Sequence, residues 1–270
     1  MKKPERIGPY TLLKRLGAGH GARVWLAQAG SGPERVALRL ARDGDDAARA
    51  CIMHEVDLAA GFNHPNIVRI YECGESRGIT WIAMEYAAGP HEPLTLANFR
   101  QLLLALVHVH ANDVVHADIE LSNLLLDESG DLKLANFSLA RRCDQGAAAQ
   151  GAGHGSPHDA PHGSPHFMAP EQLRAQPLDA RADLFAAGVV LYHILTGKMP
   201  FEGSGVEVMQ QLLNDTQPAP SAVAPGLGTS FDDMVRRALA RDRGERYASA
   251  FEFLSAFDAA CRRGVRTVAA

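Results

Sequence analysis

The hydrophobic pattern of this 270-residue chain changes its period once, near residues 87–90. Before that point, short apolar runs such as TLLKRLG, ARVWLAQ and RVALRL are separated by Gly, Pro and Ser, which is typical of strands and turns. One helix is expected within this part, over residues 45–60, because Asp45 is a good cap for the segment that follows. After it, segments such as NFRQLLLALVHVHA and AFEFLSAFDAACRR carry apolar residues at helical spacing. A sheet-rich first third followed by a helix-rich remainder predicts an α+β fold.

The composition excludes several classes of protein. Hydrophobic residues make up 46% of the chain, enough for one large core or two modest ones, and 21% of the residues are charged. A formal net charge of -4 leaves no basic excess for nucleic acid, so no nucleic-acid partner is expected. No apolar run approaches the roughly 20 residues of a membrane helix, and the basic N-terminus is not followed by an apolar stretch. We therefore expect a cytoplasmic protein with no membrane segment in this chain.

A Gly-rich turn, LGAGHGARVWLA, joins two of the strand-like runs and contains Gly17 and Gly19. Such a turn lets backbone N–H groups approach phosphates closely, although many β-hairpins are also rich in Gly. The turn becomes informative about the fold only together with the motifs that follow it in order, namely VALRL, a helical Glu55, MEY, HADIELSNLLL, LKLANFSLAR, MAPE, DLFAAG and Arg246. In order and spacing they resemble the eukaryotic-type serine/threonine protein kinases of bacteria, over about residues 8–260.

The resemblance implies a bilobal protein-kinase fold in a single kinase-like domain. A β-rich N-lobe with one regulatory helix would cover about residues 8–87, and a mainly helical C-lobe would cover about residues 88–262. It also implies that Glu171 pairs with Arg246 and that Asp183 supports the catalytic loop, three residues that we expect to hold the fold.

The resemblance further implies an ATP site. The residues that it places around the nucleotide are Gly17, Gly19, Val24, Ala37, Met84, Glu85, Ala87 and Leu125. Arg39 stands where the family has a lysine that holds the phosphates, and Glu55 is its expected partner. Arginine keeps the charge of lysine, but it is longer and planar, so the two are not equivalent at such a site.

The catalytic loop is HADIELSN where the family pattern is HRDLKPxN. Asp118 keeps the position of the base, and Asn123 keeps that of a metal ligand. Ala117 replaces the arginine that receives a phosphorylated activation segment. Glu120 replaces the lysine that steadies the transferring phosphoryl group, which reverses a charge beside a phosphate.

The metal-binding DFG of the family is Asn136-Phe137-Ser138 in this chain. An amide oxygen is a poorer ligand for magnesium than a carboxylate and brings no negative charge. We therefore expect magnesium binding at Asn123 and Asn136 to be weak, vestigial or lost.

Residues 144–166 are nearly devoid of large apolar side chains, which predicts a flexible activation segment. Its histidines recur every four residues, but the intervening Pro and Gly exclude a helix. One interpretation is a zinc or nickel site; the other, which we prefer, is a low-complexity loop. Ser156 and Ser164 are candidate phosphorylation sites. The four histidines are His154, His158, His162 and His166.

These substitutions predict a pseudokinase, that is, a chain that is not an enzyme. It would act as a scaffold or allosteric regulator of a protein partner such as an active kinase or its substrate, with nucleotide binding that is weak, metal-independent or absent. The alternative is a slow serine/threonine protein kinase that transfers the γ-phosphate of ATP with Asp118 as base. A third hypothesis is a metal- or pH-sensing module built on the histidine segment.

Overall fold

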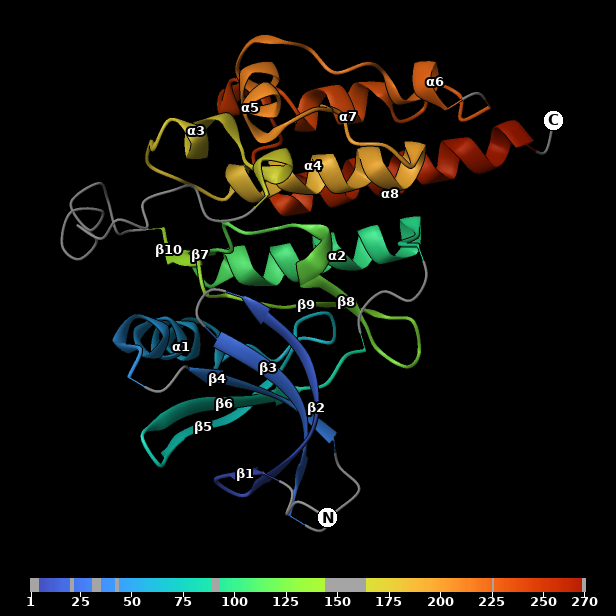
Figure 1. Ribbon diagram of the computed structural model, residues 1–270. Coiled ribbons are helices and arrows are strands. Elements are labelled where there is room, and N and C mark those ends of the chain that lie inside the picture. Colours follow the sequence, from blue (N-terminus) through green and yellow to red (C-terminus); the bar gives the residue numbers. More distant parts are fainter. Residues whose placement is uncertain are drawn as a thin grey trace. The chain divides into compact units, whose positions relative to one another are not determined.

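The computed structural model describes residues 5–19, 22–30, 35–41, 44–88, 93–143, 164–224 and 226–268. The chain divides into two compact units, one comprising Met1–Gly89 and Leu125–Leu139, the other Pro90–Leu124 and Ala140–Ala270. The first unit is built on a sheet and the second on helices (Figure 1). The predicted α+β class with a β-rich and a helical part is therefore confirmed.

The sheet of the first unit is antiparallel throughout, with the strand order β1-β2-β3-β4-β6-β5. Its strands are β1 (Arg6–Ile7), β2 (Tyr10–Gly19), β3 (Ala22–Ala29), β4 (Arg35–Ala41), β5 (Ile70–Ser76) and β6 (Ile79–Glu85). Strand β1 precedes the strand-like pattern, which the sequence predicts from residue 10 onward. It forms because Arg6 and Ile7 pair with the first residues of β2, and a two-residue strand carries no readable alternation.

Strand β4 separates two groups of apolar side chains. Val36, Leu38 and Leu40 belong to a cluster on one face of the sheet, together with Tyr10 and Trp81. Because side chains alternate along a strand, Ala37, Arg39 and Ala41 point to the other face.

On that other face, Ala41 packs with Ala48 and Ile52 of helix α1 (Asp46–Ala59). The helix begins where the sequence predicts, since the side chain of Asp45 accepts a hydrogen bond from the backbone N–H of Ala48. Arg39 thus lies on the helix-covered face of the sheet.

A small two-stranded sheet, β8 (Leu124–Leu126) with β9 (Leu132–Leu134), lies almost wholly in the first unit. The backbone N–H of Val68 donates to Leu134 at 2.9 Å, and that of Leu134 donates to Asn66 at 2.8 Å. Asn66 also donates through its side chain to the carbonyl of Leu132 at 2.9 Å. These bonds attach the segment after β9, which carries Asn136, to the first unit.

The second unit is mainly helical. Its helices are α2 (Leu96–Ala111), α3 (Pro170–Leu173), α4 (Arg181–Thr196), α5 (Gly205–Asn214), α6 (Pro220–Val223), α7 (Asp232–Ala238) and α8 (Ala250–Val268). Three short 3-10 turns, η1 (Leu121–Asn123), η3 (Pro165–Phe167) and η4 (Arg243–Glu245), and the strand pair β7 (Val114–Val115) with β10 (Arg141–Arg142) complete the described part.

Helix α2 packs against both α8 and α4 (Figure 1). The ring of Phe99 on α2 meets those of Phe253 and Phe257 on α8, with centroids 5.6 and 5.0 Å apart. Helix α2 begins at a capping box in which Thr95 and Asn98 bond to each other's backbone N–H. The long helices predicted from apolar spacing are therefore present. Among the described residues, none of the helices has the length and apolarity that crossing a bilayer requires.

Candidate functional site

Strand β4 and helix α1 bring Arg39 and Glu55 into contact. Arg39 Nη1 donates to Glu55 Oε2 at 2.5 Å, and the two side chains are only 7% and 4% exposed. The pairing that the sequence suggested is thus present, and it is almost completely buried from solvent. A buried charge of this kind is tolerated because its partner holds the opposite charge at hydrogen-bonding distance.

The tripeptide Asn136-Phe137-Ser138 is joined to this ion pair. Asn136 Oδ1 accepts a hydrogen bond from Arg39 Nη1 at 3.1 Å and another from Ser138 Oγ at 2.8 Å. The backbone N–H of Phe137 donates to Glu55 Oε1 at 3.1 Å. Asn136 has a φ of 69°, a left-handed conformation that asparagine adopts more readily than most residues.

The contacts of Asn136 bear on magnesium. An amide oxygen has two lone pairs, and the donors from Arg39 and Ser138 both bond to this one oxygen, so no lone pair is left for a cation in this arrangement. The guanidinium of Arg39 also places positive charge 3.1 Å from that oxygen. Asn136 therefore does not fit the role of a magnesium ligand as it is held here.

The apolar residues that the resemblance assigns to the nucleotide lie on neighbouring strands of the first unit. Val24 on β3 is opposite both Gly17 on β2 and Arg39 on β4. Ala37 on β4 is opposite Met84 on β6. Gly19 pairs with Ala22 at the start of β3, Ala87 is buried after β6, and Leu125 is half-buried on β8.

Glu85, also assigned to the nucleotide, has side-chain partners of its own. Its Oε1 lies 2.6 Å from Lys133 Nζ, and its Oε2 accepts from the backbone N–H of Arg69 at 3.2 Å. Its backbone N–H donates to the carbonyl of Arg69 at 2.8 Å. The side chain of Glu85 therefore ties β6 to the segment that carries Lys133.

The catalytic loop lies in the second unit and is held by Asp183 of helix α4. Both carboxylate oxygens of Asp183, which is 1% exposed, accept backbone hydrogen bonds, from His116 at 2.9 Å and from Ala117 at 2.8 Å. His110 Nε2 lies 2.9 Å from the same carboxylate. This fixes the backbone just before Asp118, although Ala117 has an unfavourable φ of 61°.

Asp118 and Asn123 are buried and in contact. Asn123 Nδ2 donates to the carbonyl of Asp118 at 2.8 Å and to Asp118 Oδ2 at 3.0 Å. The amide nitrogen makes both of these contacts, so the oxygen of Asn123 points elsewhere. The two residues to which the resemblance assigns the base and a metal ligand are therefore in direct contact.

Glu120 has a partner that the sequence did not indicate. Its Oε2 accepts from the backbone N–H of Ser164 at 3.1 Å, and Ser122 Oγ donates to its other oxygen. Ser164 Oγ lies 3.3 Å from His166 Nδ1. The acidic residue at position 120 thus fixes the end of the segment that precedes α3.

The remaining predictions for this segment concern residues that the structure does not describe. The candidate phosphorylation site Ser156 and three of the four histidines, His154, His158 and His162, lie outside the described residues. Within the described ranges there is no cluster of three or more His, Cys, Asp or Glu side chains that could hold a metal ion.

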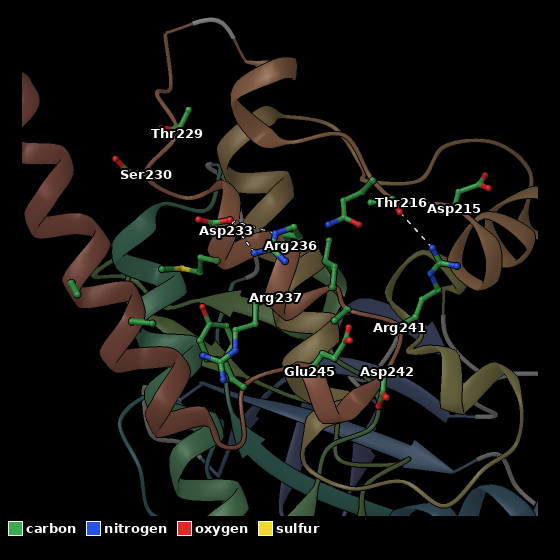
Figure 2. A pocket seen from close by; sticks show the side chains of 17 residues that line it. Asp215, Thr216, Thr229, Ser230, Asp233, Arg236, Arg237, Arg241, Asp242 and Glu245 are labelled. Carbon is green, nitrogen blue, oxygen red and sulfur yellow. Dashed lines mark hydrogen bonds and ion pairs between the residues drawn. The ribbon is translucent and has the colours of Figure 1, made fainter.

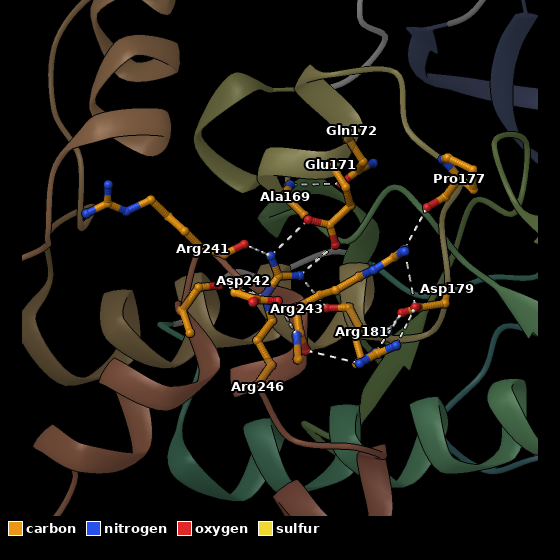
Figure 3. A network of polar contacts seen from close by, with 12 residues as sticks. Ala169, Glu171, Gln172, Pro177, Asp179, Arg181, Arg241, Asp242, Arg243 and Arg246 are labelled. Atoms are coloured by element: carbon orange, nitrogen blue, oxygen red, sulfur yellow. Dashed lines mark hydrogen bonds and ion pairs between the residues drawn. The ribbon is translucent and has the colours of Figure 1, made fainter.

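A network of hydrogen bonds around Arg246 holds helix α3, which in turn contacts the loop that carries Asp118. Figure 3 shows the guanidinium of Arg246 directed at Glu171 of α3, with Nη1 and Nη2 at 2.6 and 2.8 Å from the two carboxylate oxygens. The next residue, Gln172, donates to the carbonyl of Ala117 at 2.9 Å. Helix α3 is thereby fixed on one side to a buried cation and on the other to the loop that carries Asp118.

A groove of about 1150 Å³ opens beside α7 in the second unit (Figure 2). None of the residues predicted for the catalytic or nucleotide site lines it. Its charged side chains are partly paired with one another, as Arg236 is with Asp233 at 3.0 Å. We assign this groove no part in the chemistry.

Comparison with known proteins identifies relatives that share most of the chain. It is 33% identical over 271 residues to the probable serine/threonine-protein kinase PknB of Bifidobacterium longum, covering 91% of this chain and 39% of that protein. It is 34% identical to the serine/threonine-protein kinase PknJ of Mycobacterium bovis, covering 94% and 46%. It is 31% identical to the serine/threonine-protein kinase PrkC of Bacillus subtilis, covering 93% and 41%. The chain thus spans less than half the length of these curated relatives.

The prediction that the chain is not an enzyme is contradicted by these relatives. Proteins named as serine/threonine kinases match it at 31–34% identity over more than nine tenths of its length. The substitutions at positions 39, 120 and 136 are therefore not sufficient grounds to infer inactivity.

One comparison covers both units. The family model described as "Protein kinase domain" matches residues 10–256, from the first long strand of the sheet to the middle of α8. Since this is most of the chain, the protein belongs to the protein kinase family.

Proposed function

We propose that this chain is a slow serine/threonine protein kinase that transfers the γ-phosphoryl group of ATP to a hydroxyl of a protein substrate. The observation that carries the proposal is the buried contact of Asp118 with Asn123, in a loop that Asp183 holds through two backbone hydrogen bonds. The names of the relatives support the choice of serine and threonine as acceptors.

Asp118 would act as the base. Its carboxylate accepts the proton of the substrate hydroxyl while the hydroxyl oxygen forms a bond to the γ-phosphorus. The bond between that phosphorus and the bridging oxygen breaks, and ADP leaves with the electron pair. Positioning and charge stabilisation supply most of the catalysis in this reaction class, so a fixed loop is the main requirement.

Glu120 explains why the reaction should be slow. The family has a cation at this position, and here the charge is reversed. At an effective dielectric constant of about 20, one pair of unit charges about 4 Å apart interacts by roughly 4 kcal/mol. Even about a quarter of that energy, about 1 kcal/mol, applied against the developing charge lowers the rate about fivefold.

The test is phosphoryl transfer from labelled ATP, measured as autophosphorylation and on a generic Ser/Thr-rich protein, with magnesium, with manganese and with neither. Wild-type protein should transfer slowly, and Asp118→Asn should abolish transfer while the melting temperature changes little. Asp57→Asn, at an exposed position on α1, is the matched control and should leave the rate unchanged.

Glu120→Lys provides a second comparison. It restores the family's cation, and we expect the rate to rise by about fivefold or more, as the energy worked out above implies. The proposal is abandoned if wild-type protein shows no transfer under any of these conditions, or if Asp118→Asn transfers as fast as wild type.

A further inference from the structure

The oxygen of Asn136 is the atom with which this residue would bind a cation, and it is already engaged. Two donors from different residues, Arg39 Nη1 and Ser138 Oγ, lie 3.1 and 2.8 Å from it. Both contacts would have to break before a divalent ion could use that oxygen. The ion would then also lie close to the guanidinium of Arg39.

The net charge of the cluster formed by Arg39, Glu55 and Asn136 also argues against a cation at Asn136. Arg39 contributes +1, Glu55 contributes −1 and Asn136 is neutral, so the cluster sums to zero. With the family's carboxylate at position 136, the same cluster would sum to −1 and would repel a polyphosphate unless a cation lay between them. The neutral amide removes that repulsion, and with it the need for a cation at this place.

Arg39 keeps donors for a ligand. The hydrogen bonds of its guanidinium to Glu55 and to Asn136 both use Nη1. Among the described residues, Nε and Nη2 have no hydrogen-bond partner, although Arg39 as a whole is only 6% exposed. Two donors in a fixed fork suit phosphate oxygens. Val24, opposite Arg39 on β3, and Ala37, two residues before Arg39 on β4, are among the residues that the resemblance assigns to the nucleotide.

We propose that Arg39 holds the phosphates of ATP or ADP directly, and that this binding needs no divalent cation at Asn136. The inference rests on the proposed function only for the identity of the nucleotide. It concerns binding, so it can be tested without phosphoryl transfer.

The experiment measures the Kd of a fluorescent ATP analogue, with excess chelator and with saturating magnesium. For wild-type protein the two values should agree within about threefold, because no carboxylate at position 136 demands a cation. In Asn136→Asp, binding with chelator should weaken and magnesium should tighten it by about tenfold or more, since the cluster then carries a net negative charge.

Two controls separate this effect from others. Asn112→Asp adds the same charge at an exposed position after α2 and should leave the magnesium dependence of wild type unchanged. Arg39→Lys keeps the charge and loses the fork, so it should weaken binding of ATP by about tenfold while binding of adenosine, which has no phosphates, stays the same. Thermal melting of each variant shows whether it is folded.

The inference is overturned if magnesium tightens wild-type binding about tenfold or more, or if wild-type protein binds no nucleotide in either condition. It is distinguishable from the kinase proposal. Nucleotide binding without a metal but no phosphoryl transfer would sink the kinase and leave this inference standing, whereas magnesium-dependent binding with transfer would do the reverse.

Discussion

The ion pair between Glu171 and Arg246 is the place where a single change should cost this protein the most stability. The side chain of Arg246 is 0% exposed, and both of its terminal nitrogens bond to the carboxylate (Figure 3). Glu171→Gln keeps the shape of the side chain but removes its charge, which leaves the guanidinium buried without a counter-ion. Removing one partner of a buried pair usually costs about 3–5 kcal/mol.

The structure places the expected value at the lower end of that range. Arg246 also donates to the carbonyls of Ala240 at 2.7 Å, Arg181 at 3.0 Å and Arg241 at 3.2 Å, and these bonds remain in the variant. Its guanidinium further lies 4.9 Å from the ring centroid of Phe185. We therefore expect a loss of about 3 kcal/mol, or roughly a factor of 100 in the unfolding equilibrium.

Urea denaturation followed by far-ultraviolet circular dichroism measures this loss, because the helices lie mainly in the unit that contains the pair. The chain offers a comparison in Arg100 and Asp258, which also form two hydrogen bonds to one carboxylate, here through Nε and Nη2 at 2.9 and 3.1 Å. That pair is exposed by 48% and 28%, so Asp258→Asn should cost less than about 1 kcal/mol. Equal losses in the two variants would refute the argument that burial, rather than geometry, sets the magnitude.

Two further predictions concern the second unit. In Gly188→Ala, the added Cβ would lie 2.8 Å from Ala238 Cβ and 3.1 Å from Leu239 Cδ2, so α4 and α7 must move apart. We expect a loss of about 1–3 kcal/mol in the same denaturation assay, and an unchanged midpoint would contradict this close packing. At Asp179, burial raises the pKa, but hydrogen bonds from Arg181 outweigh it and hold the pKa below its ordinary value of 3.8. The stabilisation is therefore present above that value and is lost as the pH falls through the lower, folded-state pKa, so Asp179→Asn should flatten the acid side of a plot of Tm against pH.

Much of the fold could be predicted from the sequence because it depends on the spacing of apolar residues and on the order of the motifs along the chain. Helix α2 extends over Leu96–Ala111, close to the apolar run from which it was predicted, and α1 begins at the expected cap. The contact of Glu171 with Arg246 followed from the order of motifs alone. Those features depend on residues whose type and position in the chain are sufficient to identify them.

The contact between Glu120 and Ser164 could not be predicted in that way. The two residues are 44 positions apart, and Ser164 donates through its backbone N–H, a group that every residue except proline has. Only the course of the chain brings that N–H to the carboxylate. From the sequence, Glu120 could be interpreted only as the loss of the family's lysine. The structure adds that its carboxylate holds the segment before α3.

The same limit applies to Arg39 and Asn136, which the sequence presented as two separate losses. In the structure they are one arrangement, because Arg39 Nη1 contacts both Glu55 and the amide oxygen of Asn136. With a carboxylate at position 136, one buried cation would face two anions. With the amide, the same hydrogen bond forms and the cluster stays neutral. Only the change at position 136 alters the charge of the cluster, because arginine keeps the charge of lysine. Restoring the carboxylate at position 136 should therefore make the cluster net negative and disturb the contacts of Arg39 with both side chains.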